Sequence, residues 1–117
     1  MLLRLSSAAL LGIVLWIPQS YAYDLVAGKA KVDAVCYKCH GRQGISVSNI
    51  HPNLAGQREA YISIQLRAFR SGSRVHSKMT GVAKELTDAD IENVAAYFSR
   101  QRPMYAQPLE LPPEFRL

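Results

Sequence analysis

Apolar residues recur at intervals of three and four positions through most of the chain after residue 23, and no stretch alternates apolar and polar residues as a half-buried strand would. The first such stretch predicts a helix over Leu25 to Tyr37, with Asp24 as its N-terminal cap. Its small and apolar residues form two adjoining stripes, Val26, Ala30 and Ala34, and Gly28, Val32 and Val35. The pattern therefore predicts an all-α fold.

Two further helices are expected. Residues 57–70 predict the second, because Ile62, Leu66 and Phe69 share one face and Gly72 lies just past its end. The third follows Thr87, which forms an approximate capping box with Asp90, and it continues through Arg100 and Arg102 until Pro103 stops it. Its apolar face consists of Ile91, Val94, Ala95 and Phe98.

The segments that separate these helices differ from them in composition. Residues 41–56 are rich in Gly, Ser, Asn and Pro and predict a long loop, and residues 71–85 predict a second irregular segment. Four prolines after residue 102 predict an extended tail over 103–117. We expect one domain over residues 23–102.

The first 22 residues have the features of an export signal. Arg4 supplies a positive start, Ala8 to Ile17 is an apolar run, and Ser20-Tyr21-Ala22 is a small-x-small cleavage site. An uncleaved membrane anchor is disfavoured because a spanning helix needs roughly 20 apolar residues. We expect a periplasmic protein that begins at Tyr23 and has no membrane-spanning segment after cleavage.

The size and charge of the chain indicate what the fold needs for stability and which partners it favours. Removal of 22 of the 117 residues leaves a small domain that needs an additional source of stability. The net charge is +5, or +4 without Arg4, which favours protein partners with acidic docking surfaces or anionic membrane surfaces. No basic run interleaved with aromatic residues is present, so nucleic acid is not an expected partner.

The segment Cys36-Tyr37-Lys38-Cys39-His40 has the spacing by which a chain attaches haem covalently. Each thiol forms a thioether to one vinyl group, and the imidazole of His40 then lies below the iron as an axial ligand. We therefore expect one haem c, covalently held by Cys36 and Cys39. A structural zinc site would need a second pair of ligands, and the sequence has no second cysteine pair. A redox-active dithiol would be expected in a βαβ unit, and the sequence pattern predicts no strands.

An electron-carrying haem needs a ligand on the other side of the iron as well. Met79 lies in the irregular segment after the second helix, and a thioether there raises the reduction potential. The alternative for Met79 is a gap-filling role in the core. His76 would give a bis-histidine haem of lower potential, but we expect His76 to be an exposed loop residue and His51 to lie at the rim of the site.

With these motifs the chain resembles the class I c-type cytochromes, in particular the small bacterial monohaem proteins and single halves of the two-haem periplasmic cytochromes. The resemblance covers nearly all of the chain from residue 23 to about residue 100. Its motifs are Cys36-Tyr37-Lys38-Cys39-His40-Gly41, Pro52-Asn53-Leu54-Ala55-Gly56-Gln57, Tyr61, Gln65-Leu66, Phe69-Arg70-Ser71-Gly72, Met79-Thr80-Gly81, Leu86-Thr87-Asp88-Ala89-Asp90-Ile91 and Ala95-Ala96-Tyr97-Phe98.

The resemblance implies a cytochrome c fold, with three main helices around one haem. It implies that the carbonyl of Pro52 accepts from the axial histidine and so orients it. It also implies that the first helix crosses the last, with Gly28 and Val32 against Val94 and Tyr97. Three further residues are expected to hydrogen-bond the haem propionates: Gln57, Tyr61 and Arg74.

These features together predict an electron-transfer protein that is not itself an enzyme. With His40 and Met79 on the iron, no coordination position is left for a substrate. One alternative is a haem c relay subunit of a larger periplasmic dehydrogenase or oxidase. A second alternative is a haem sensor or gas-binding protein, which would require Met79 to leave the iron.

Overall fold

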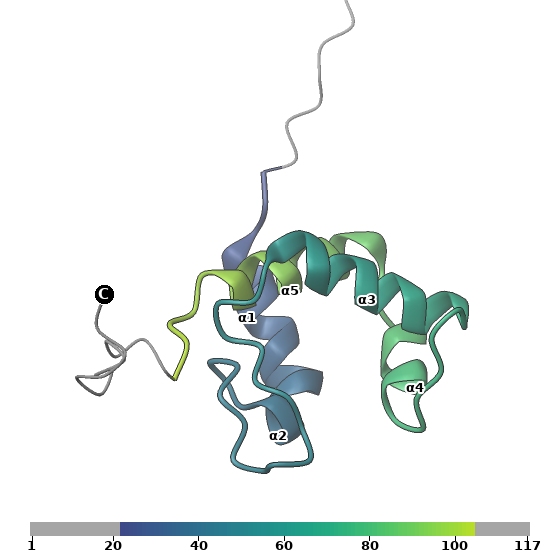
Figure 1. Ribbon diagram of the computed structural model, residues 1–117. Helices are drawn as coiled ribbons and strands as arrows, with labels where there is room; N and C mark the ends of the chain where they lie inside the picture. The colour runs from purple at the N-terminus through teal and green to yellow at the C-terminus, as the bar shows by residue number, and fades with distance from the viewer. Residues whose placement is uncertain (1–21, 105–117) are drawn as a thin grey trace, which may run out of the picture.

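The computed structural model describes residues 22–104, which contain helices and turns but no β-strand (Figure 1). The predicted export signal before Ala22 and the predicted tail after Met104 lie outside the described residues. No helix within the described part is long and apolar enough to cross a membrane. The fold is therefore all-α, as the apolar spacing predicts.

The first helical run extends from Leu25 to His40 and contains a change of helix type. It consists of α1 (Leu25–Lys31), the π-helix η1 (Val32–Cys36) and α2 (Tyr37–His40). Asp24 caps α1 as predicted, because its carboxylate accepts from the N–H of Ala27 at 2.9 Å. The run ends at His40, three residues later than predicted, and the sequence pattern does not predict the π segment.

Helix α1 crosses α5 (Asp88–Ser99) at Gly28. A Cβ atom on Gly28 would lie 2.3 Å from the backbone oxygen of Asn93 and 3.2 Å from the Cβ of Tyr97, so only glycine permits this separation of the helices. The N–H of Asp24 donates to Oδ1 of Asn93 at 3.0 Å and fixes the start of α1 against α5. The predicted crossing, including Tyr97, is confirmed.

The predicted stripes of the first helix were only partly correct. Gly28 and Val32 are buried and Val32 belongs to the core, whereas Val35 is 45% exposed. The other predicted stripe is exposed to solvent: Val26, Ala30 and Ala34. Small residues on a short helix do not determine which of two adjoining faces is buried, because a neighbouring helix decides this by packing.

The core lies between α3 (Glu59–Ser71), α5 and the start of η1. Helix α3 begins two residues later than predicted and ends one residue later, directly before Gly72. Helix α5 has the predicted capping box, with both Thr87–Asp90 hydrogen bonds at 3.0 Å, but it ends at Ser99 rather than Arg102. The buried cluster consists of Val32, Ile62, Leu66, Leu86, Ile91, Val94, Ala95 and Phe98.

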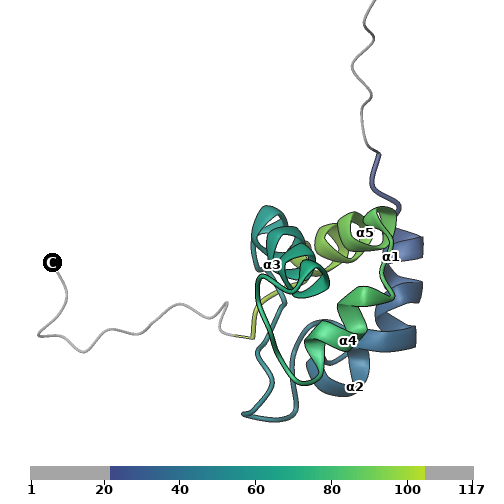
Figure 2. The ribbon, with the colours of Figure 1, turned by 90° about the vertical axis from the view of Figure 1, so that its right-hand side faces the viewer.

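Residues 71–85, predicted to be irregular, contain a fourth α-helix, α4 (Met79–Lys84). Ala83 is fully buried and Leu86 is 5% exposed, so the segment packs onto α3 through apolar contacts that are too few to give a periodic pattern. Figure 1 shows α3 and α5 side by side at the top, with α2 and α4 below them at opposite ends. The turned view in Figure 2 shows α4 and α2 on the same side of the layer that α3 and α5 form.

Candidate haem-binding site

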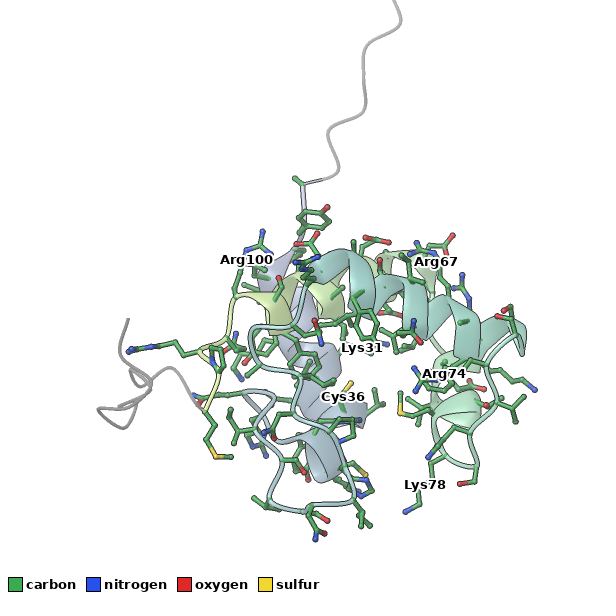
Figure 3. The ribbon with its side chains drawn as sticks, in the orientation of Figure 1. Lys31, Cys36, Arg67, Arg74, Lys78 and Arg100 are labelled. Atoms are coloured by element: carbon green, nitrogen blue, oxygen red, sulfur yellow. The ribbon has the colours of Figure 1, made fainter. Side chains whose placement is uncertain are left out.

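The predicted attachment residues occupy the end of the first helical run. Cys36 is the last residue of η1, and Cys39 and His40 lie in the single turn of α2. Both cysteines are free thiols and half-buried, so neither is used in a disulfide. Figure 3 shows the side chain of Cys36 pointing away from α1 toward the side on which α4 lies.

His40 is oriented by one hydrogen bond. Its side chain is buried, and Nδ1 lies 2.9 Å from the carbonyl oxygen of Pro52. Because a carbonyl oxygen can only accept, Nδ1 carries the hydrogen and Nε2 keeps its lone pair. Burial lowers the pKa of His40, with an opposing contribution from the Pro52 hydrogen bond, so the ring is neutral at neutral pH. The chain thus presents an imidazole in the tautomer that binds iron through Nε2.

The loop that carries Pro52 is folded back on itself. The carbonyl of Gly44 accepts from the N–H groups of Leu54 and Ala55, at 2.8 and 3.1 Å. Gly44 has φ +75°, and a Cβ atom on it would lie 2.6 Å from the backbone nitrogen of Ala55 and 2.9 Å from the Phe98 ring. Only glycine combines this conformation with such close contact. The carbonyl that orients His40 is therefore held on a loop that is tied to α5.

The thiol of Cys36 is in an environment that disfavours charge. Burial raises the pKa of Cys36 to about 11, and the nearby positive charge of Lys31 opposes this only weakly. A thiolate ligand to a metal would carry a negative charge into this site, whereas a thioether is neutral. Within residues 22–104, no three His, Cys, Asp or Glu side chains are close enough to hold a metal ion. The surroundings of Cys36 therefore suit a neutral thioether better than a charged thiolate.

Met79 is the first residue of α4 and is half-buried. It packs against the core cluster that Cys36 also contacts, so the thioether and one attachment thiol border the same apolar core. The prediction that an irregular backbone aims the sulfur was wrong, because a helical turn fixes the backbone of Met79. Its ligand role stays a prediction.

The three predicted propionate donors do not form one group. Gln57 lies two residues before α3 and Tyr61 in its first turn, whereas Arg74 follows the end of this helix, and a helix of 13 residues is roughly 20 Å long. Gln57 is half-buried and accepts from the N–H of Arg58, and Tyr61 is 48% exposed. The guanidinium of Arg74 donates to Gln65 and lies over the ring of Phe69, 4.5 Å from its centroid.

Arg42 is a residue near the motif that sequence analysis missed. Its guanidinium donates to Asp33 at 2.7 Å and lies 4.4 Å from the centroid of the Tyr37 ring, while its carbonyl accepts from the hydroxyl of Tyr97 at 3.1 Å. These contacts hold the turn after the attachment motif against α5. Only the position of Arg42, two residues after the motif, could have drawn attention to it.

Taken together, the site consists of two free thiols one helical turn apart, a neutral buried imidazole beside them and a thioether bordering the same core. This donor set and the all-α fold define a c-type haem protein. A cytochrome c family model matches residues 25–101, and the chain belongs to the cytochrome c family. Covalent haem c is the cofactor of this family, so the predicted cofactor, class and fold are confirmed.

Two curated relatives show what the chain is similar to. It is 43% identical over 81 residues to a cytochrome c4 of Pseudomonas aeruginosa, covering 69% of this chain and 40% of that one. It is 40% identical over 83 residues to cytochrome c-554(548) of Halomonas halodenitrificans, covering 68% of this chain and 99% of that one. The chain thus spans less than half the length of the cytochrome c4 relative.

Solved structures give the same picture. Reduced recombinant cytochrome c4 from Pseudomonas stutzeri has a TM-score of 0.64 at 43% identity, covering 69% of this chain and 47% of that one. Thiosulfate dehydrogenase (TsdBA) from Marichromatium purpuratum has a TM-score of 0.66 at 29% identity, covering 71% of this chain and 20% of that one. The fold described for residues 22–104 therefore matches one part of larger proteins.

Proposed function

We propose that the protein is an exported electron carrier with a single haem c, held through Cys36 and Cys39 and ligated axially by His40 and Met79. The observation that carries this proposal is the hydrogen bond from His40 to Pro52, which leaves Nε2 as a neutral ligand beside two free thiols. When bound, the haem iron supplies one-electron chemistry by alternating between Fe(II) and Fe(III). Similarity to the cytochromes c supports the role.

The axial ligands decide between electron transfer and catalysis. His40 approaches from α2 and is fixed by Pro52, and Met79 belongs to α4 and borders the same core as Cys36. If the chain fills both axial positions, neither O₂ nor a substrate has a place on the metal. The protein then acts as a carrier and not as an enzyme.

The remaining predicted residues have supporting roles in this proposal. Gln57, Tyr61 and Arg74 are proposed to hydrogen-bond the haem propionates, because a partly buried carboxylate needs donors. Arg74 is the strongest candidate of the three because it is charged. Its present partner, Gln65, is a neutral amide that a carboxylate can replace at little cost.

Surface charge suggests the kind of redox partner. Lys38 lies within the attachment motif, and Lys78 lies beside Met79; both are exposed. Figure 3 shows Lys78 and Arg74 at the α4 end of the molecule. With the overall positive charge, these residues favour a partner with an acidic docking surface. Export through the signal at residues 1–22 is part of the same proposal, because both the partner and haem attachment are then outside the cytoplasm.

A second candidate function is electron relay within a larger exported enzyme. The supporting observation is the similarity to part of a thiosulfate dehydrogenase structure. In that case the chain would be found in stoichiometric complex with a catalytic subunit. Isolation as a free monomer from its native source would argue against it.

The proposal is tested on the purified mature protein by mass spectrometry and by an optical redox titration. We expect the peptide spanning Cys36 and Cys39 to carry one porphyrin, and the chain to begin at Tyr23. We also expect a c-type spectrum with no carbon monoxide binding to the reduced form at neutral pH. Absence of the porphyrin mass would refute haem attachment, whereas ready carbon monoxide binding would refute ligation by Met79.

A further inference from the structure

His76 makes an unusual set of contacts with the first turn of α4. Its Nδ1 accepts from the backbone N–H groups of Lys78 and Met79, both at 3.2 Å. In return the N–H of His76 donates to the hydroxyl of Thr80 at 2.9 Å. The carbonyl of His76 accepts from the N–H of Thr80 at 3.2 Å, which closes a helical turn. His76 is thus bonded to each residue from Lys78 to Thr80.

This arrangement resembles a helix N-cap, with an imidazole in the place of the usual short polar side chain. Like a cap, the side chain accepts from the N–H groups two and three residues further on, here those of Lys78, which directly precedes α4, and of Met79, its first residue. Thr80 completes the cap from the other direction by accepting from the N–H of His76. His76 is exposed, as predicted, but its Nδ1 is committed to the backbone of Met79.

The cap is in turn anchored to α3. The His76 ring meets the ring of Phe69 edge-on, with centroids 6.3 Å apart, and Phe69 is only 7% exposed. The loop between them is fixed at Arg74, whose N–H donates to the carbonyl of Ala68 at 3.1 Å. Contacts therefore run without a gap from the buried face of α3, through His76, to the backbone of Met79.

We infer that His76 is a positioning residue for the axial thioether: it fixes the first turn of α4 and so the direction in which Met79 presents its sulfur. The inference rests on the proposed ligation by Met79. A helix of six residues has little stability of its own, so its cap matters more than it would in a long helix. His76 therefore positions the methionine ligand and is not itself a ligand of the iron.

The test measures how readily imidazole displaces Met79 from the iron of the oxidised holoprotein. His76→Ala removes the acceptor and should tighten apparent imidazole binding by roughly 2- to 30-fold, the range expected for loss of an N-cap. It should also lower the reduction potential, since a thioether raises it. His76→Asn keeps a side-chain acceptor suited to an N-cap and should restore both quantities toward the wild-type values.

Two further variants separate positioning from general stability. Thr80→Val removes only the hydroxyl that accepts from the N–H of His76 and should tighten imidazole binding to a smaller extent. If His76→Ala fails to mature, Thr80→Val still tests whether these contacts position Met79. Thr87→Ala removes the corresponding cap from α5 and should lower thermal stability without changing imidazole affinity.

The outcomes are distinguishable. Wild-type imidazole affinity in both His76→Ala and Thr80→Val would overturn the inference, as would failure of His76→Asn to differ from His76→Ala. If the oxidised wild-type protein lacks the thioether-to-iron charge-transfer absorption, the proposed ligation by Met79 itself fails.

Discussion

Gly28→Ala should destabilise the protein through the contact between α1 and α5. The new methyl group would lie 2.3 Å from the carbonyl oxygen of Asn93, and ordinary contact begins at about 3.4 Å. The helices must therefore separate by about 1 Å, since a backbone carbonyl cannot rotate away. This separation also strains the hydrogen bond from Asp24 to Asn93.

The size of the effect follows from two opposing contributions. Overpacking of this kind costs about 1–3 kcal/mol, and the upper end applies because the obstacle is backbone. Alanine is a better helix former than glycine by about 1 kcal/mol, which offsets part of the cost. The net loss is about 2 kcal/mol, and the melting temperature should fall by roughly 10 °C.

Urea unfolding of the holoprotein, followed by far-ultraviolet circular dichroism, measures this loss. Ala30→Ser, on the exposed face of the same helix, is the matched control and should cost only about 0.5 kcal/mol. A Gly28→Ala protein as stable as the wild type would show that the two helices do not cross as closely as described.

Three further predictions concern the site and its surroundings. Met79→Ala should abolish the thioether-to-iron absorption, lower the reduction potential and permit carbon monoxide binding, whereas Met104→Ala, at a half-exposed methionine, should change none of these. Pro52→Ala should leave the reduction potential nearly unchanged, because a backbone carbonyl accepts from His40; a change as large as that for Met79→Ala would contradict the assigned hydrogen bond. The hydrogen bond from Arg70 lowers the pKa of Asp88, so this pair stabilises the fold above about pH 4 and ceases to do so as the pH falls through the lowered value. Arg70→Gln should therefore destabilise at neutral pH, and in urea titrations the difference should shrink as the pH falls below about 4. A part independent of pH should remain, because the variant also loses the hydrogen bond from Arg70 to the carbonyl of Leu86.

Sequence features with a specific chemical partner were the ones that could be predicted. Asp24 and Thr87 were recognised as caps because a cap needs a particular side chain at a particular distance from the helix. The attachment motif and the Pro52 contact with His40 were likewise read from spacing and from the family resemblance.

Features that depend on packing between helices could not be read in this way. Helix α4 has only one fully buried residue, Ala83, and its start is stabilised by a histidine that no capping rule would select. The sequence pattern does not predict the exposure of Val26 and Val35, because the close approach of α5 to Gly28 determines which face of the first helical run is buried. Single-sequence periodicity contains no information about that approach.

The π-helix η1 allows the first helical run to pack Gly28 against α5 and to direct Cys39 and His40 toward a different side. Tyr37 donates to the carbonyl five residues before it, at Val32, so this turn holds one residue more than an α-helical turn. One residue corresponds to about 100° of rotation around the axis. The direction of Cys39 and His40 is thereby offset from the face that Gly28 presents to α5. Loss of a single residue here would leave the helix more regular and turn the side chains of Cys39 and His40 away by more than a right angle.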